Sequence, residues 1–261
     1  MAILTPLPAA TVTLVRDGEQ GLEVLMMKRN MQSAFVPGRY LFPGGHVDPT
    51  DGLADIYSHC MGLDDAAASM RLGIESGGLA FWVAAIRECF EESGLLLAHG
   101  ENGKPIAHER AAKLAQYRKA VAAGDHPFDT LLRDEGLTLE VDSLVYFAHW
   151  ITPPGAPRRY DTRFFVAHAP AGQEAVHDNE EMTESVWINP RDGVERHKAG
   201  TFKLMTPTIH SLKLFAKYET ADSLLAAMRV LPNVPRIAPR IDPSGRRVLP
   251  GEPGYDALPA D

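Results

Sequence analysis

The stretch Arg87-Glu88-Cys89-Phe90-Glu91-Glu92-Ser93-Gly94-Leu95 decides the fold, and it lies in a helix that we predict over residues 79–97. At about 100° per residue, Val83, Ile86 and Phe90 fall on one apolar stripe. This stripe predicts that the helix packs against a sheet. Cys89 is expected to be a buried packing residue.

The acidic residues of this stretch share a different face of the helix. Glu88, Glu91 and Glu92 are spaced i, i+3 and i+4, so their carboxylates lie close together and repel each other unless a cation neutralises them. Mg²⁺ and Mn²⁺ prefer such oxygen ligands. A solvated acidic face with an Arg87–Glu91 ion pair is the alternative, and the three glutamates alone favour neither.

A second stretch stands upstream, Phe42-Pro43-Gly44-Gly45-His46-Val47-Asp48-Pro49-Thr50-Asp51. Together the two stretches resemble the signature box of the Nudix hydrolase superfamily: Gly, five residues, Glu, seven residues, then Arg-Glu-aliphatic-x-Glu-Glu-x-Gly-aliphatic. Gly45 matches the opening Gly, and Asp51 stands at the first Glu, where we expect a structural tie. The second half is matched by Arg87, Glu88, Glu91, Glu92, Gly94 and Leu95.

The box is split in this chain by an insertion within residues 52–79. Asp51 and Arg87 are separated by 35 residues instead of seven, which costs little stability if the two ends remain close. A split box resembles the subgroup of the peroxisomal coenzyme A diphosphatases, and residues 38–45 resemble the end of their coenzyme A signature. Its upstream Arg is replaced by Ala34, although Lys28, Arg29 and Arg39 are nearby.

The resemblance implies roles for these residues. Glu88, Glu91 and Glu92 would be metal ligands together with the Gly45 carbonyl, Arg87 would orient the carboxylates, and Gly94 would end the helix. Mg²⁺ or Mn²⁺ would assist water attack on one phosphorus of a nucleoside diphosphate linkage. Catalysis would fall to Glu91 and Glu92, with Glu181 or Glu184 as further candidates for the general base; a solvated loop is the equal alternative for these two.

Coenzyme A or an acyl derivative is the first substrate that we expect from the resemblance. NADH and ADP-ribose are the alternatives within the class, and a non-catalytic nucleotide-sensing module is the alternative from another class. A Pro-rich loop at residues 152–157 precedes Arg158, Arg159 and Tyr160. Guanidinium groups suit phosphate oxygens, so these residues and Arg39 are substrate-binding candidates, against an alternative of surface ion pairs.

The composition argues against nucleic acid and membranes as binding partners. A net charge of −8 gives no global basic field for nucleic acid or an anionic membrane. There are two cysteines, too few for a disulfide framework, and neither a signal-peptide pattern nor an apolar run of membrane-spanning length occurs. The end of the chain is no peroxisomal address. We expect a cytoplasmic protein and, from the family resemblance, a homodimer.

The resemblance implies a Nudix α/β/α sandwich with a mixed sheet, in one domain of residues 1–261. The core would span about residues 9–190, followed by C-terminal helices and an irregular Pro-rich tail within residues 200–261. Thr206 is the predicted cap of one of these helices, with Pro207 as its first residue. Strands are predicted at 11–15, 23–27, 143–151, 162–168 and 186–188, and further helices at 64–72, 105–123 and 128–135.

Overall fold

A mixed sheet forms the centre of the fold. The computed structural model describes residues 4–33 and 36–259 of the chain, so Ala34 lies outside the described residues. The strand order is β10-β7-β8-β1-β2-β3, with β4 paired to β1 and β9 paired to β2. β1 is parallel to β8 and antiparallel to β2 and β4. The strands are β1 (Leu7–Gly18), β2 (Gly21–Arg29), β3 (Tyr40–Leu41), β4 (Gly44–His46), β7 (Val145–Ile151), β8 (Tyr160–His168), β9 (Met182–Ile188) and β10 (Arg236–Ile237).

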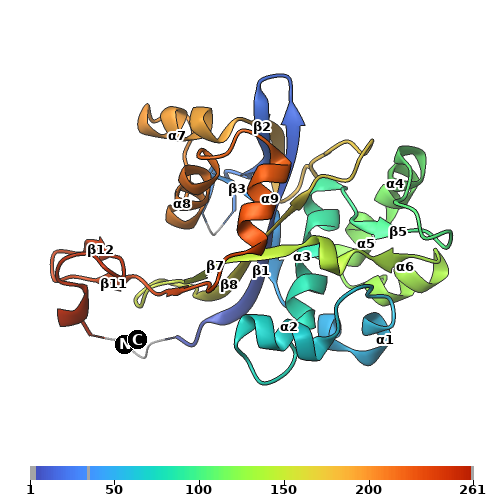
Figure 1. Cartoon of the computed structure of the whole chain (residues 1–261), viewed down its shortest axis with the longest axis horizontal. Coiled ribbons are helices and arrows are strands. Elements are labelled where there is room, and N and C mark those ends of the chain that lie inside the picture. Colours follow the sequence, from blue (N-terminus) through green and yellow to red (C-terminus); the bar gives the residue numbers. More distant parts are fainter. Residues whose placement is uncertain (1–3, 34–35, 260–261) are drawn as a thin grey trace.

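Helices cover both faces of this sheet (Figure 1), which confirms the predicted α/β/α sandwich. Successive side chains of β2 point to opposite faces of the sheet and so divide the hydrophobic core into two clusters. Leu25 and Met27 pack in the cluster that contains α3 (Leu79–Ser93), and Val24 and Met26 pack in the cluster on the opposite face. That second cluster includes side chains of α7 (Pro190–Lys198), α8 (Thr206–Phe215) and α9 (Ala221–Arg229).

Helix α3 is buried on almost every side, beyond the single apolar stripe that the sequence predicts. Cys89 is fully buried, as expected, and Glu88 and Glu91 are its only partly exposed residues. The helix ends at Ser93 rather than at residue 97, because Gly94 takes the left-handed conformation (φ 74°) that closes a helix.

The insertion follows η1 (Pro49–Gly52), which carries Asp51, and folds into α1 (Ala54–Tyr57) and α2 (Asp65–Leu72). It is fastened to the first residues of α3 by hydrogen bonds. The Asp65 carboxylate accepts hydrogen bonds from the backbone N–H groups of Leu79 and Gly77, both at 2.9 Å. Burial alone would raise the pKa of Asp65, but these hydrogen bonds lower it below its usual value. The insertion is therefore packed against α3 and holds the first residues of that helix in place.

Replacing Gly78 with Ala is expected to loosen this fastening. A Cβ at Gly78 would lie 2.3 Å from the Ser69 backbone nitrogen of α2, so the backbone must shift. Such overpacking lowers the free energy of unfolding by about 1–3 kcal/mol, measured by urea denaturation. Gly52→Ala is the control, because its Cβ would meet nothing closer than 3.8 Å. Equal stability of the two variants would contradict the docking.

Beyond α3 the chain forms a helical cap in which one prediction is wrong. Instead of one helix over residues 105–123, a 3₁₀ turn, η2 (Ala115–Tyr117), separates two short helices and redirects the chain. The helix predicted at 128–135 is confirmed within one residue, and the strand predicted from residue 143 begins two residues later, at Val145. The cap comprises β5 (Ala98–His99), α4 (His108–Leu114), α5 (Arg118–Ala122), α6 (Phe128–Asp134), β6 (Thr138–Leu139) and η3 (Val141–Ser143).

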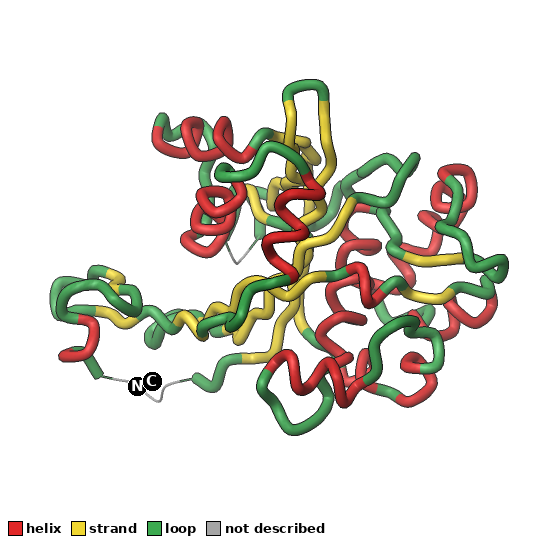
Figure 2. Tube along the Cα trace, viewed as in Figure 1, coloured by secondary structure: helices red, strands yellow, loops and turns green. Residues whose placement is uncertain are grey.

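Two C-terminal predictions also need correction. Helix α8 is capped by Met205, and Thr206 is already its first helical residue, because the extended backbone lies one residue earlier. The tail is not wholly irregular: β10 extends the sheet beside β7, and β11 (Arg240–Ile241) pairs with β12 (Arg247–Val248) before η4 (Tyr255–Ala257). Figure 2 shows these strand segments within the tail. In the described ranges, no helix is long and apolar enough to cross a bilayer.

Candidate active site

Two glycines of β4 bring the backbone onto the acidic face of α3. Gly44 donates its N–H to Glu92 Oε2 at 3.0 Å. A Cβ at Gly45 would lie 2.5 Å from Glu88 Oε1. A Cβ at Gly44 would lie 2.4 Å from the Ala10 carbonyl oxygen, so this position requires glycine. The upstream half of the box thus fits directly against the glutamates of the downstream half.

Arg87 joins the two halves across the insertion. Its Nε and Nη2 donate to the two oxygens of Asp51, both at 2.9 Å, and this bidentate pair is almost fully buried. Nη1 donates to Glu88 and Glu91, each at 3.0 Å, and Nη2 also donates to the His46 carbonyl. Asp51 thus stands in a structural tie, and Arg87 positions two of the three glutamates.

Burial makes the acidic cluster costly to ionise. It raises the pKa of Glu88 to about 8; the charge of Arg87 opposes this rise, while Glu91 and Glu181 add to it. Burial also raises the pKa of Glu91, against the opposing charge of Arg87. It raises the pKa of Glu92 well above its usual value, and Glu88 and Glu181 add to this shift. Without a cation, burial therefore favours the protonated forms of these three carboxyl groups.

The donor set fits a hard divalent cation in its chemistry. All three groups are carboxylates, the preferred ligands of such ions, and the Glu88 carboxylate lies directly against the Gly45 backbone. Within residues 4–33 and 36–259, no three His, Cys, Asp or Glu side chains already surround one point. Glu88 and Glu91 are instead turned toward Arg87, so a cation would require these side chains to rotate away from it.

The two downstream glutamates lie on different sides of the sheet. Glu181 acts electrostatically on Glu88 and Glu92, and it forms an ion pair with Arg29. Glu184 instead hydrogen-bonds Tyr40, a residue of the opposite core cluster. Glu181 therefore lies near the acidic residues of α3, and Glu184 does not.

The candidate phosphate-binding residues are not gathered into one group. Arg159 is buried, where it donates to the carbonyls of Thr152 and Leu4, while Arg158 is exposed. Arg39 donates to the Leu204 carbonyl. Tyr160 lies edge-on to His46, with ring centroids 5.8 Å apart, so it is next to β4. The buried contacts of Arg159 favour a structural role for it.

One residue at the site was not anticipated from the sequence. Arg118 of α5 donates from Nε to the Glu91 carbonyl at 3.0 Å, across 27 positions of the chain. No spacing or motif connects these residues, because the contact depends on how the cap folds over the end of α3.

Comparison with known proteins identifies the family and the fold. A family model described as the NUDT19 Nudix domain matches residues 66–215, more than half of the chain. The chain belongs to this Nudix family. A solved NUDIX hydrolase from Alicyclobacillus acidocaldarius has the same fold, with a TM-score of 0.68 and 28% identity over 88% of this chain and all of that one.

Curated relatives of this Nudix hydrolase include proteins named acyl-coenzyme A diphosphatase NUDT19. The Xenopus laevis protein is 26% identical over 92% of this chain and 72% of its own length. The human protein is 25% identical over 78% of this chain and 63% of its own length. The match therefore spans less than two thirds of the human relative.

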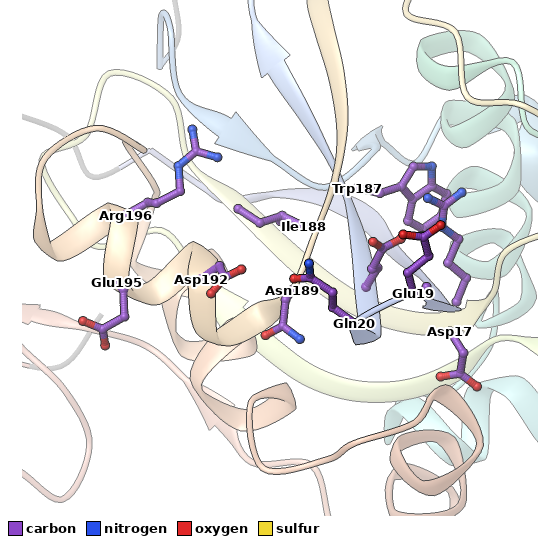
Figure 3. A pocket seen from close by; sticks show the side chains of 12 residues that line it. Asp17, Glu19, Gln20, Trp187, Ile188, Asn189, Asp192, Glu195 and Arg196 are labelled. Atoms are coloured by element: carbon purple, nitrogen blue, oxygen red, sulfur yellow. The ribbon is translucent and has the colours of Figure 1, made fainter.

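A cavity of about 850 Å³ lies away from the glutamate cluster, between the β1–β2 turn and α7 (Figure 3). Trp187 lines this cavity, and the Arg16 guanidinium lies 4.2 Å from the Trp187 ring centroid. Asp17 in its wall accepts from the Ala221 N–H at the start of α9, and Glu23 pairs with Arg16. These contacts are structural, and none of the box residues lines this cavity.

Proposed function

We propose that this Nudix hydrolase cleaves a nucleoside diphosphate linkage with Mg²⁺ or Mn²⁺, and that coenzyme A or acyl-coenzyme A is its substrate. The observation that carries the proposal is the fit of Gly44 and Gly45 against the buried glutamates of α3. Relatives named acyl-coenzyme A diphosphatase support the substrate. Nudix hydrolases generally use divalent metal ions, which supports the cofactor.

Glu88, Glu91 and Glu92 would hold the cation, with the Gly45 carbonyl as a further ligand. The bound cation would supply charge neutralisation for the phosphate oxygens and lower the pKa of the attacking water. Arg87, held by Asp51, keeps the glutamates in position. As the water oxygen bonds to phosphorus and the bridging P–O bond breaks, the water proton passes to a carboxylate of the chain.

Glu181 is the carboxylate that we assign to this proton transfer. Its side chain is 48% exposed, it is paired with Arg29, and its charge reaches Glu88 and Glu92. Glu181→Gln is expected to lower kcat about 10²- to 10⁴-fold with a smaller change in KM. Glu184→Gln is the matched comparison across the sheet; a larger loss there than at position 181 would contradict the assignment.

Metal stabilisation is expected to grow with pH. The folded-state pKa of Glu88, about 8, lies above its ordinary value of 4.5, so the metal-free fold loses stability as pH rises between these values. A cation offsets that loss. Mg²⁺ at about 100 times the Kd that holds at pH 8 should raise the melting temperature by about 5–10 °C at pH 8, and the same concentration should raise it much less at pH 5. Equal shifts at both pH values would contradict the site.

The test of function is a substrate panel with Mg²⁺ or Mn²⁺: coenzyme A, an acyl-coenzyme A, NADH, ADP-ribose and nucleoside triphosphates. Metal-dependent release of adenosine 3′,5′-bisphosphate from the coenzyme A compounds is the expected result, because the ribose of coenzyme A carries a 3′-phosphate. Faster hydrolysis of NADH or ADP-ribose would contradict the proposal that coenzyme A or acyl-coenzyme A is the substrate. Silence across the panel from folded, metal-binding protein would favour a nucleotide-sensing module. Cytoplasmic location and a homodimer stay predictions.

A further inference from the structure

The end of α3 is held by groups from outside the helix. Gly94 donates to the Phe90 carbonyl and closes the helix there, so the carbonyls of the following residues need partners from elsewhere. Arg118 Nε donates to the Glu91 carbonyl at 3.0 Å, and a Cβ at Gly94 would lie 3.2 Å from Arg118 Nη1. The guanidinium therefore packs against the last turn of α3, which carries the carboxyl groups of Glu91 and Glu92.

The same end of α3 contacts the loop between β8 and β9, which carries Glu181 and runs toward α4 in Figure 1. The Val176 N–H of this loop donates to the Ser93 carbonyl at 2.8 Å. The Gln173 side chain accepts from the Leu96 N–H at 3.0 Å and donates to the Leu96 carbonyl at 3.1 Å. The proposed base and the proposed metal ligands are therefore carried by two segments that meet at one end of a helix.

Asp178 orders the part of this loop that carries the proposed base. Its carboxylate accepts from the N–H groups of Glu180, Glu181 and Met182, at 3.2, 3.1 and 2.7 Å. Burial lowers the pKa of Arg118, and the charge of Asp178 is the largest effect that opposes this shift. One guanidinium is thus bonded to the end of α3 and attracted by the carboxylate that holds the backbone at Glu181.

We propose that Arg118 is a positioning residue of this hydrolase, which fixes the distance between the metal-ligand end of α3 and the general base Glu181. The base takes a proton only within hydrogen-bond reach of the attacking water, so a shift of about 1 Å in either segment slows the step. Because Arg118 belongs to α5, the cap sets the spacing of carboxylates that lie outside it. This inference rests on the proposed function, in which Glu181 accepts the proton of the water.

The first test is a double-substitution cycle with Glu181, on the compound of the substrate panel that the protein hydrolyses fastest. Arg118→Gln should lower kcat at least about tenfold with little change in KM. In a Glu181→Gln protein the same substitution should lower kcat less than about twofold, because the base to be positioned is gone. Asp178→Asn, which weakens the link from the loop side, should show the same dependence on Glu181. Lys119→Gln is the control, since it removes a charge from the next residue of α5 whose ion pair with Glu180 is exposed.

Equal losses in both backgrounds would overturn the proposal, since Arg118 would then act only through the stability of α3. A native kcat in Arg118→Gln would overturn it as well, and if that variant does not fold, Asp178→Asn carries the cycle. Hydrogen exchange needs no turnover: the N–H groups of Glu181 and Met182 should exchange at least about tenfold faster in Arg118→Gln than in Lys119→Gln. Unchanged exchange would overturn the positioning role. Faster exchange in a protein that hydrolyses no compound of the panel would support the link and reject the proposed function instead.

Discussion

Replacing Glu92 with Gln is expected to lower kcat/KM for diphosphate hydrolysis about 10³-fold, because it removes several kcal/mol of charge stabilisation at the cation. Glu92 is 3% exposed and accepts from Gly44, and an amide oxygen can keep this hydrogen bond. The substitution also removes a carboxyl that burial makes costly to ionise. Kinetics at saturating Mg²⁺ and thermal melting without metal are the measurements.

The stability readout separates this explanation from misfolding. The metal-free Glu92→Gln protein should melt at the same temperature as the native protein or above it at pH 8, while its stabilisation by Mg²⁺ falls. Glu195→Gln is the control, since Glu195 is an exposed residue of α7 paired with Lys198. Near-native turnover in the Glu92 variant would remove it from the proposed ligand set.

Asp51→Asn is expected to lower the free energy of unfolding by about 3 kcal/mol. The amide cannot accept two hydrogen bonds from the Arg87 guanidinium, so a buried cation loses its bidentate partner. Asp51 also accepts from the Asp48 N–H, and that bond is weakened too. Urea denaturation of the metal-free protein measures the loss, and kcat should fall with it because Arg87 positions Glu88 and Glu91.

Asp48→Asn provides the matched comparison for this buried pair. Asp48 lies 3.5 Å from the same guanidinium, but its side chain is 53% exposed, so solvent weakens the attraction. Its replacement should cost less than about 1 kcal/mol. If the two variants lose equal stability, burial is not what makes the Asp51–Arg87 pair strong.

The box residues and the sandwich could be predicted from the sequence because they are local or periodic. The apolar positions of β2 repeat every two residues, and Gly94 ends α3 as a local conformational signal. The break at residues 115–117 could not be predicted, since Ala115-Gln116-Tyr117 contains neither Gly nor Pro. Its conformation depends on the packing of the cap.

The site was predictable only as far as the motif reaches. Asp51 and Arg87 match fixed positions of the box, and the sequence predicted a structural tie at Asp51, but that Arg87 is its partner is seen only in the structure. Glu181 and Glu184 looked equivalent in the sequence, but Glu181 lies just before β9 and forms an ion pair with Arg29. Glu184 lies within β9 opposite Lys28, whose side chain lies with Tyr40. Arg118 reaches the site through tertiary packing, which leaves no sequence signal.

The fastening of the insertion to the start of α3 has a consequence for the order of folding. The two halves of the site meet only after the chain between Asp51 and Arg87 has closed its loop, and Asp65 makes that closure durable through the N–H groups of Gly77 and Leu79. Contacts of such sequence separation form late rather than early. A partly folded chain therefore has an incomplete acidic site, and catalytic competence arises only when the whole sandwich is assembled.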